Sequence, residues 1–343
     1  MLFAASAVPA VADTYTITDL GTLGGTSSYA FNINNSGSVI GWSANASGSM
    51  HAFLYSNGTM IDLGTLGGSQ SAAYGINDSG QIVGDSGLSG GGSHAFLYRG
   101  GTMTDIHPPL AGNNSYATGI NATSQVVGYS GGQHALLWDA NDPGGALDLG
   151  TLGGNYSVAE DINDVGQVCG RANTSTSTHA FLYTNETMLD LGTLGGISLG
   201  SAINSSGQVA GDSSYTGGQE NSHACLFSGG TVTDLGTLGG TRSGAVGIND
   251  SGQVVGWSYT NAGIMHAFLY DDGVMQDLNT LIPVGSGWTL DYALDINNSG
   301  AIVGYGTNPS GETHAFLLTP EPATLSLLAL GGAALLRRRR RHK

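Results

Sequence analysis

The sequence predicts an all-β fold, a closed seven-bladed β-propeller built from four-stranded blades. A segment of about 43 residues is repeated seven times, and its aspartate recurs at Asp19, Asp62, Asp105, Asp148, Asp190, Asp234 and Asp277. Each copy contains four short apolar or alternating segments separated by Gly, Asn, Asp and Ser, a pattern typical of strands and turns. A repeat of this length with four strands matches a propeller blade.

The two ends of the repeat array predict how the ring closes. Residues 15–20 (YTITDL) match the fourth strand of the later copies, but none of the other three strands precedes them. The seventh copy ends at residues 314–318 (HAFLL) without this strand. We therefore expect the N-terminal strand to complete the last blade, which removes unpaired sheet edges. The propeller should occupy residues 13–319 as a single domain.

The turns between the first and second strands also follow a pattern. Most copies have Asn-Asp-Ser-Gly or Asn-Asn-Ser-Gly, in which Asn caps its own turn and Gly adopts a positive φ. The third copy has Asn121, Ala122, Thr123 and Ser124 instead, so we expect a strained or differently shaped turn there. The connections at residues 105–112 and 277–288 depart from the usual GTLGG and should give the ring a unique side.

Acidic residues dominate the body of the chain. Residues 13–319 contain three basic and 24 acidic residues, a formal net charge of −21. Such a surface repels phosphate backbones, which makes nucleic acid a poor partner. Cations and neutral glycans are easier for it to accept.

The two termini differ in character from the repeats. Residues 1–12 are apolar and end in the small-x-small pattern of a secretory cleavage site, so we expect a signal peptide. Its basic start is absent, so either the start codon is misplaced or the signal is truncated. Residues 320–343 contain a Pro-Glu-Pro motif, an apolar run and an arginine cluster. The apolar run predicts a short helix of about 21 Å, less than the ~30 Å of a bilayer core. The motif and cluster are Pro320, Glu321, Pro322, Arg337, Arg338, Arg339, Arg340 and Arg341.

Two resemblances follow from these motifs. The HAFLY, DLGTLGG and INDSGQVVG segments resemble the extracellular HAF repeat family over about residues 15–318. Residues 320–343 resemble a PEP-CTERM sorting signal. That second resemblance implies export in a Gram-negative bacterium, transient anchoring in the inner membrane and processing by an exosortase-type enzyme. It also implies a final location at the cell surface or in an extracellular matrix. Neither resemblance supplies a ligand or a reaction.

Seven histidines begin the HAF-type segments: His51, His94, His134, His179, His223, His266 and His314. Equivalent positions on separate blades are too far apart to share one metal ion. We expect a structural role, in which each His hydrogen-bonds to the Asp of the following DLG segment. His51 would pair with Asp62, and Asp148 and Asp190 would serve the third and fourth copies.

Seven positions vary in residue type between the copies and are the candidates for ligand binding. Each follows the glycine of the second strand, and they are Trp42, Asp85, Tyr129, Arg171, Asp212, Trp257 and Tyr305. Propeller symmetry should place them at similar radius. Aromatic faces with carboxylates are typical of a carbohydrate-binding surface. Ordinary packing between blades is an equally good interpretation.

Calcium is the only cofactor that the sequence brings into question. Asp161 and Asp295 precede Ile-Asn turns and are its candidate ligands, but most copies have glycine or alanine there. Calcium needs six to eight oxygen ligands, which argues against a site in most blades. The remaining candidate side chains, Cys169 and Cys225, lie in different copies, and we expect buried free thiols.

These observations predict an exported, monomeric and non-catalytic scaffold that binds a polysaccharide or a protein partner at the cell surface or in a matrix. The sequence contains no nucleophile motif, zinc spacing or phosphate-binding loop. The alternative is a propeller-fold enzyme acting on extracellular polysaccharide, a glycosidase or a lyase. Its carboxylates would come from different blades and are not recognisable from spacing alone.

Overall fold

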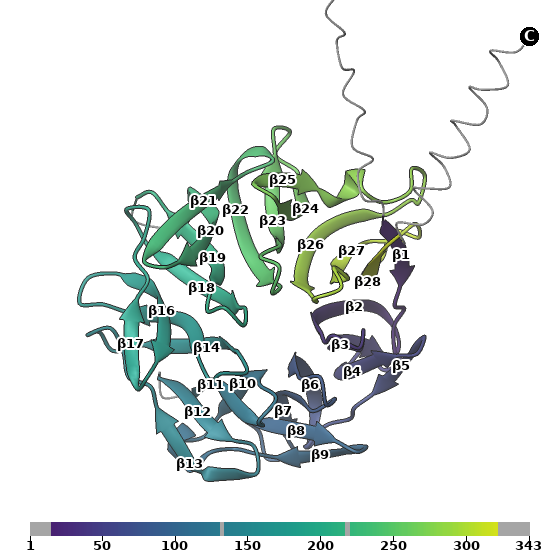
Figure 1. Cartoon of the computed structure of the whole chain (residues 1–343). Helices are drawn as coiled ribbons and strands as arrows, with labels where there is room; N and C mark the ends of the chain where they lie inside the picture. The colour runs from purple at the N-terminus through teal and green to yellow at the C-terminus, as the bar shows by residue number, and fades with distance from the viewer. Residues whose placement is uncertain (1–14, 131–133, 217–219, 322–343) are drawn as a thin grey trace, which may run out of the picture.

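A computed structural model describes residues 15–130, 134–216 and 220–321. In it, seven four-stranded antiparallel sheets are arranged in a ring, which confirms the predicted propeller (Figure 1). The expected signal peptide (residues 1–12) and the expected C-terminal apolar helix lie outside the described residues. Within the described ranges, no helix is long and apolar enough to cross a bilayer.

Each blade is one sheet, and in blades 1 to 6 its four strands follow chain order from the centre outwards (Figure 1). Blades 1 and 2 contain β2 (Gly24–Ile33), β3 (Val39–Asn45), β4 (Met50–Ser56), β5 (Thr59–Asp62), β6 (Gly67–Ile76), β7 (Ile82–Leu88), β8 (Ser93–Arg99) and β9 (Thr102–Asp105). Blades 3 and 4 contain β10 (Ser115–Ile120), β11 (Gln125–Ser130), β12 (Ala135–Asp139), β13 (Asp142–Asp148), β14 (Ser157–Ile162), β15 (Val168–Asn173), β16 (Thr178–Thr184) and β17 (Thr187–Asp190).

Blades 5 and 6 contain β18 (Ser198–Ile203), β19 (Val209–Ser214), β20 (Ser222–Ser228), β21 (Thr231–Gly236), β22 (Gly239–Ile248), β23 (Val254–Thr260), β24 (Met265–Asp271) and β25 (Val274–Asp277). Blade 7 consists of β26 (Thr289–Ile296), β27 (Ile302–Thr307), β28 (Thr313–Pro320) and β1 (Tyr15–Asp19). The two unusual connections each contain a 3₁₀ turn, η1 (Pro109–Ala111) and η2 (Leu278–Thr280).

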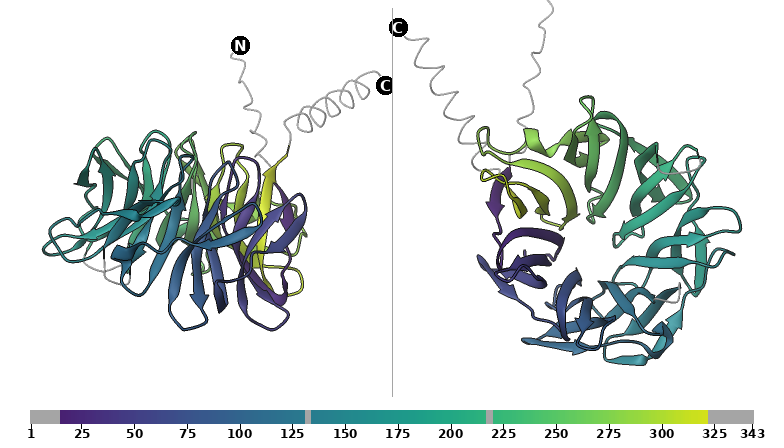
Figure 2. Two further views of the ribbon diagram at one scale, coloured as in Figure 1. Left: turned by 90° about the horizontal axis from the view of Figure 1, so that it is seen from below. Right: turned by 180° about the vertical axis from the view of Figure 1, so that it is seen from behind.

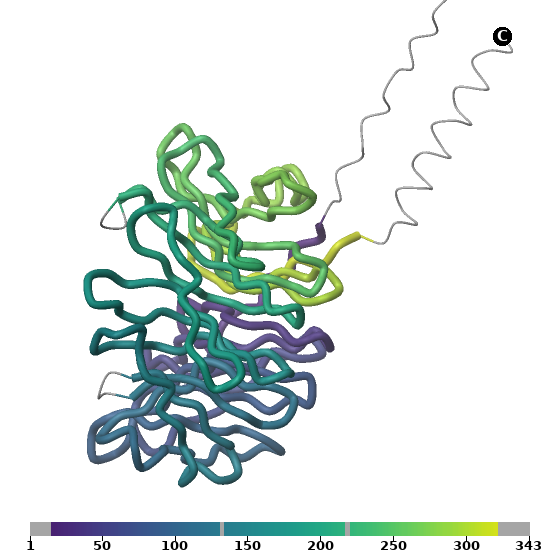
Figure 3. Tube along the Cα trace, turned by 60° about the vertical axis from the view of Figure 1, so that its left-hand side comes forward, coloured from purple at the N-terminus to yellow at the C-terminus, as the bar shows by residue number. Residues whose placement is uncertain are grey.

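The N-terminal strand closes the ring, as the repeat phase predicts. β1 pairs antiparallel with β28, from Tyr15 opposite Pro320 to Asp19 opposite Phe316. The purple first strand and the yellow last strand lie side by side in every view (Figure 2, Figure 3). Pro320, which the sequence analysis assigned to the tail, is instead the last residue of β28. Proline is tolerated there because the pairing of β28 with β27 ends at Leu318.

The apolar core lies between the blades. Seven clusters of buried residues each draw on two neighbouring blades, one for every interface. In one of them Phe96 of blade 2 packs with Ile40 and Ala52 of blade 1. The phenylalanine of the HAF segment is fully buried, and full burial contributes about 1.5–3 kcal/mol per side chain. Cys169 and Cys225 are buried free thiols, as expected, and belong to the interface between blades 4 and 5.

The asparagines that begin the turns between first and second strands form a ring of hydrogen bonds. Asn34 Oδ1 caps its own turn by accepting from the backbone N–H groups of Ser36 and Ser38. Its Nδ2 donates to the backbone carbonyl of Asn77 in the next blade, at 3.1 Å. The same bond crosses all seven interfaces, through Asn34, Asn77, Asn121, Asn163, Asn204, Asn249 and Asn297.

Two details of the blades differ from the expected pattern or sharpen it. The first strands of blades 1, 2 and 6 begin at Gly24, Gly67 and Gly239, so the GTLGG segment is partly strand and not only a connection. Their φ values of 97–104° lie in the region that favours glycine. In the third blade, Ser124 adopts a φ of 66° where other blades have glycine, so this turn is strained, as predicted.

Candidate binding face and central channel

The ring has two distinct ends. The asparagine face carries the turns between first and second strands, and the loop face carries the second-to-third-strand loops and the connections between blades. The seven variable residues of the second strands are all half-buried, in the middle of those strands. Each lies opposite a first-strand residue, which adds Tyr29, Ala72, Tyr116, Val158, Leu199, Gly244 and Tyr292 to the same layer.

Five of these side chains form a continuous run of aromatic contacts, which we call the aromatic arc. It consists of Trp257, Tyr292, Tyr305, Tyr29 and Trp42, from blades 6, 7 and 1. Successive ring centroids are 6.0, 4.9, 4.6 and 4.3 Å apart, and the second and fourth contacts are stacked. The Arg242 guanidinium lies 5.7 Å from the Trp257 ring centroid. Three of the seven predicted residues therefore meet in one half-buried surface.

Next to the arc, Trp42 and Asp85 line a pocket between blades 1 and 2. This inter-blade pocket has a volume of about 340 Å³ and also includes Gln70, Tyr74 and Ser93. The Asp85 carboxylate accepts hydrogen bonds from the hydroxyl groups of Ser93 and Tyr74. Burial raises the pKa of Asp85 above its ordinary value, although both hydrogen bonds oppose this effect. An oriented carboxylate beside an indole face is suited to holding a polar ring compound.

The central channel is lined by residues that sequence reasoning missed. Every first strand shifts register by one residue at a β-bulge, between Ala73 and Gly75 in blade 2, for example. The bulged residues line one pocket in the channel, and they are Phe31, Tyr74, Thr118, Glu160, Ser201, Val246 and Leu294. The residue type at this position varies between copies, and that variation is the sequence signal that could have identified these residues. An alternating pattern cannot reveal a bulge, because the inserted residue breaks the alternation.

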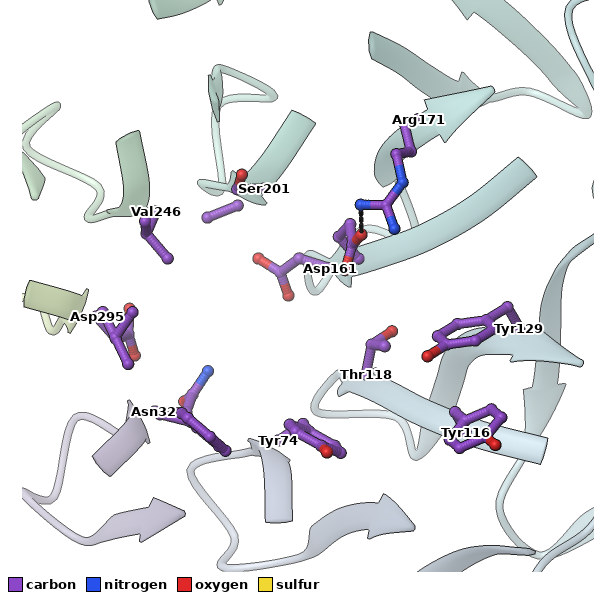
Figure 4. Close-up of a pocket in the computed structure, with 14 residues that line it drawn as sticks. Asn32, Tyr74, Tyr116, Thr118, Tyr129, Asp161, Arg171, Ser201, Val246 and Asp295 are labelled. Carbon is purple, nitrogen blue, oxygen red and sulfur yellow. Dashed lines mark hydrogen bonds and ion pairs between the residues drawn. The ribbon is translucent and has the colours of Figure 1, made fainter. Parts of the chain in front are cut away.

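This channel pocket has a volume of about 350 Å³ (Figure 4). Two predicted residues, Tyr129 and Arg171, line it, and Tyr129 stacks on Tyr116 with centroids 4.8 Å apart. Burial raises the pKa of Tyr129 to about 12. Arg171 Nη1 donates to Glu160 Oε1 at 2.5 Å. Burial raises the pKa of Glu160 even though the guanidinium opposes the shift.

The calcium candidates Asp161 and Asp295 lie between two pockets of the channel, since each lines both the channel pocket and a second pocket at the asparagine face. Asp161 accepts from the backbone N–H groups of Ile162 and, across the blade interface, Ile203. Asp295 accepts in the same way from Ile296 and Ile33. Burial raises the pKa of Asp161 to about 6 and of Asp295 to about 7.

These aspartates are inter-blade hydrogen-bond acceptors. Among the described residues, no group of three or more His, Cys, Asp or Glu side chains has the arrangement of a metal site. Calcium needs six to eight oxygen ligands, so binding of calcium by Asp161 and Asp295 is tested by direct titration.

The structure has the expected His–Asp hydrogen bond in all seven blades. The distance from His Nδ1 to the nearer carboxylate oxygen is 2.7–3.0 Å in every pair. Each pair lies at the outer strands, away from the channel, and the last pair joins His314 to Asp19 of β1. Among the remaining predicted residues, Asp212 is not a member of the arc, and burial raises its pKa to about 6.

Comparisons with known proteins agree with this architecture. The model of the PEP-CTERM protein-sorting motif matches residues 318–341. No curated protein matches the sequence. The β-propeller domain of the Trilobed protease from Pyrococcus furiosus superposes with a TM-score of 0.58 and 11% identity, over 86% of this chain and 94% of that one. That domain is described as having an open velcro topology, whereas β1 closes the ring here.

A second solved structure is similar in fold. The acylaminoacyl peptidase of Pyrococcus horikoshii superposes with a TM-score of 0.51 and 12% identity, over 84% of this chain and 51% of the peptidase. At such identities the likeness concerns the fold alone. Fold and motif together define a seven-bladed β-propeller that carries a PEP-CTERM sorting motif. Such motifs mark exported proteins, are recognised by exosortase-type processing enzymes and imply transient membrane anchoring through the tail.

Proposed function

We propose that this protein is a non-catalytic, extracellular binding scaffold that holds a polysaccharide on the loop-face side of its channel. The aromatic arc carries this proposal. Five aromatic side chains from three blades remain half-buried instead of fully packed, so part of their ring surface is available to a ligand. Flat aromatic faces bind the apolar faces of sugar rings, and nearby carboxylates accept from hydroxyl groups.

The inter-blade pocket supports the same ligand class. Trp42 belongs to both the arc and this pocket, so a sugar chain lying on the arc would place one residue beside Asp85. Asp85 is already oriented by two hydroxyl donors, which lowers the cost of ordering it on binding. We further propose membership of the HAF repeat family, a Gram-negative source, a cell-surface or matrix location and a monomeric state.

One observation favours the alternative of a polysaccharide-cleaving enzyme. Burial raises the pKa of Glu160 and Asp212, as in carboxyl groups that act as general acids. The two mechanisms are separated by product analysis. If the protein releases new reducing ends or unsaturated sugars, and Glu160→Gln or Asp212→Asn abolishes this release, then the protein is an enzyme and not a binding scaffold.

Binding itself is tested with the full chain and a panel of neutral, acidic and amino-substituted bacterial polysaccharides, with and without calcium. We expect saturable binding to at least one polymer and no change in its length. If no member of the panel binds, the arc is packing between blades and the scaffold holds a protein partner instead.

A further inference from the structure

The charges that line the channel pocket are unbalanced. Its lining includes the carboxyl groups of Glu160, Asp161 and Asp295 and a single cationic side chain, Arg171. Arg171 is already paired with Glu160. Asp161 and Asp295 receive only backbone N–H groups and have no cationic partner among the lining residues.

The surroundings reinforce this imbalance. At the asparagine face the channel continues into a pocket of about 250 Å³ that adds the carboxyl groups of Asp78, Asp164 and Asp250 and no basic residue. With the formal charge of −21 on residues 13–319, the channel concentrates cations and repels anions. A uronic acid or a phosphate group is therefore a poor occupant, whereas an ammonium group is a favourable one.

One wall of the channel pocket is aromatic. Tyr116 stacks on Tyr129, and Tyr74 stacks on Phe31 with ring centroids 5.4 Å apart (Figure 4). Ring faces attract ammonium groups and the C–H faces of sugars alike. The volume of about 350 Å³ lies at the lower end of the range for small-ligand pockets, which suits one or two sugar rings.

The channel pocket adjoins the inter-blade pocket. Tyr74 and Tyr116 line both of them, so one saccharide chain can occupy the two together. We propose that the channel pocket binds an amino sugar with a free, protonated amino group, which lies between the tyrosine wall and the carboxylates of Asp161 and Asp295. This inference rests on the proposed function, because it names the sugar class within the polysaccharide.

Calorimetric titration of the full chain at pH 6.5 and low salt tests the assignment. The probes are a β-1,4-linked glucosamine tetrasaccharide, its N-acetylated counterpart and spermidine. We expect the glucosamine tetrasaccharide to bind at least tenfold more tightly than each of the other two. Asp295→Asn should reduce this preference at least threefold, because it removes a carboxyl group that the bound ammonium group would hold ionised and keeps the shape of the side chain.

Asp161→Asn provides the same test in another blade, in case Asp295→Asn does not fold. Asp272→Asn, in an exposed turn of blade 6, removes the same charge far from the channel and should leave the preference intact. Equal affinity for the two tetrasaccharides would overturn the amino-sugar assignment and leave the proposed function standing. Equal or tighter binding of spermidine would also overturn it, because the sugar ring would then contribute nothing. Failure of both tetrasaccharides to bind would overturn the amino-sugar assignment alone, whereas failure of the whole polysaccharide panel as well would overturn both proposals.

Discussion

The side-chain nitrogen Nδ2 of Asn297, in the last blade, donates a hydrogen bond of 3.1 Å to the backbone carbonyl of Asn34, in the first. The two residues are 263 positions apart in the sequence. The ring is thus closed twice, by the pairing of β1 with β28 on its outside and by an asparagine bond beside its channel. The same asparagine bond joins each of the other six pairs of neighbouring blades. Beside the channel, the interface between blades 7 and 1 is therefore like the others.

The asparagine ring predicts a large effect from an isosteric change. Asn249→Asp replaces the donor to the Asn297 carbonyl by an acceptor, so two oxygens face each other in a buried site. We expect a loss of about 2–3 kcal/mol in the free energy of unfolding, measured by chemical denaturation. Asn261→Asp, in an exposed turn of the same blade, should change it little. Equal effects of the two variants would mean that the ring is not a source of stability.

The His–Asp pairs predict a measurable coupling. His51 and Asp62 are hydrogen-bonded at 2.9 Å in partly exposed positions. A double-mutant cycle with His51→Ala and Asp62→Ala should give a coupling energy of about 1 kcal/mol. Asp62 also accepts from the backbone N–H of Gly64, so Asp62→Ala alone should cost more than His51→Ala. A coupling energy of zero would leave the recurrence of this pair without a structural explanation.

The channel carboxyl groups predict an unusual pH dependence. In the folded protein the pKa of Asp161 is about 6 and that of Asp295 about 7, against an ordinary value of 3.8. The folded state therefore binds protons more tightly than the unfolded chain between about pH 4 and 7. Stability should fall as the pH rises through this window, so the melting temperature should be higher at pH 5 than at pH 8.

The double variant Asp161→Asn/Asp295→Asn removes these two groups and should reduce this dependence, while Asp212, whose pKa is also raised to about 6, continues to contribute. Melting curves at both pH values provide the measurement. A wild-type melting temperature that rises from pH 5 to pH 8 would show that these groups remain ionised in the folded state.

The turns between first and second strands predict a backbone effect. Gly80 adopts a φ of 78° in open space, so a methyl group there meets no neighbour and only the backbone is strained. Gly80→Ala should cost about 1–2 kcal/mol. Gly90→Ala, equally open but without a positive φ, should be neutral or slightly stabilising. The difference is measured by denaturation, and equal values would contradict the strain argument.

The blade count could be predicted from the seven copies of the repeat, and the strand order from the four segments within each copy. The closure by β1 could be predicted because the two ends of the array complement each other. The strained turn at Ser124 could also be predicted, since glycine is missing there. The asparagine ring could not be predicted, because capping of the local turn is a sufficient reason for an asparagine at position 34. The second role of Asn34 becomes visible only when the position of Asn77 in the next blade is known. A contact between blades depends on radius and tilt, which no single repeat encodes.

The candidate site could be predicted only in part. The variable second-strand positions include three members of the aromatic arc and two residues of the channel pocket. The bulged residues were missed, although Tyr74 and Glu160 are central to the channel. A bulge moves one side chain out of the alternating pattern, so its direction follows from the sheet geometry and not from the sequence period.

The most direct test of the binding proposal is the affinity of the full chain, as wild type and as Trp42→Ala/Trp257→Ala, for the polysaccharide that binds best. We expect binding to fall at least tenfold in the double variant while its melting curve stays cooperative. Trp42→Phe/Trp257→Phe should retain part of the affinity, and Tyr215→Ala, an exposed aromatic outside the arc, should retain all of it. Undiminished binding by the folded double alanine variant would contradict the aromatic arc as the ligand site.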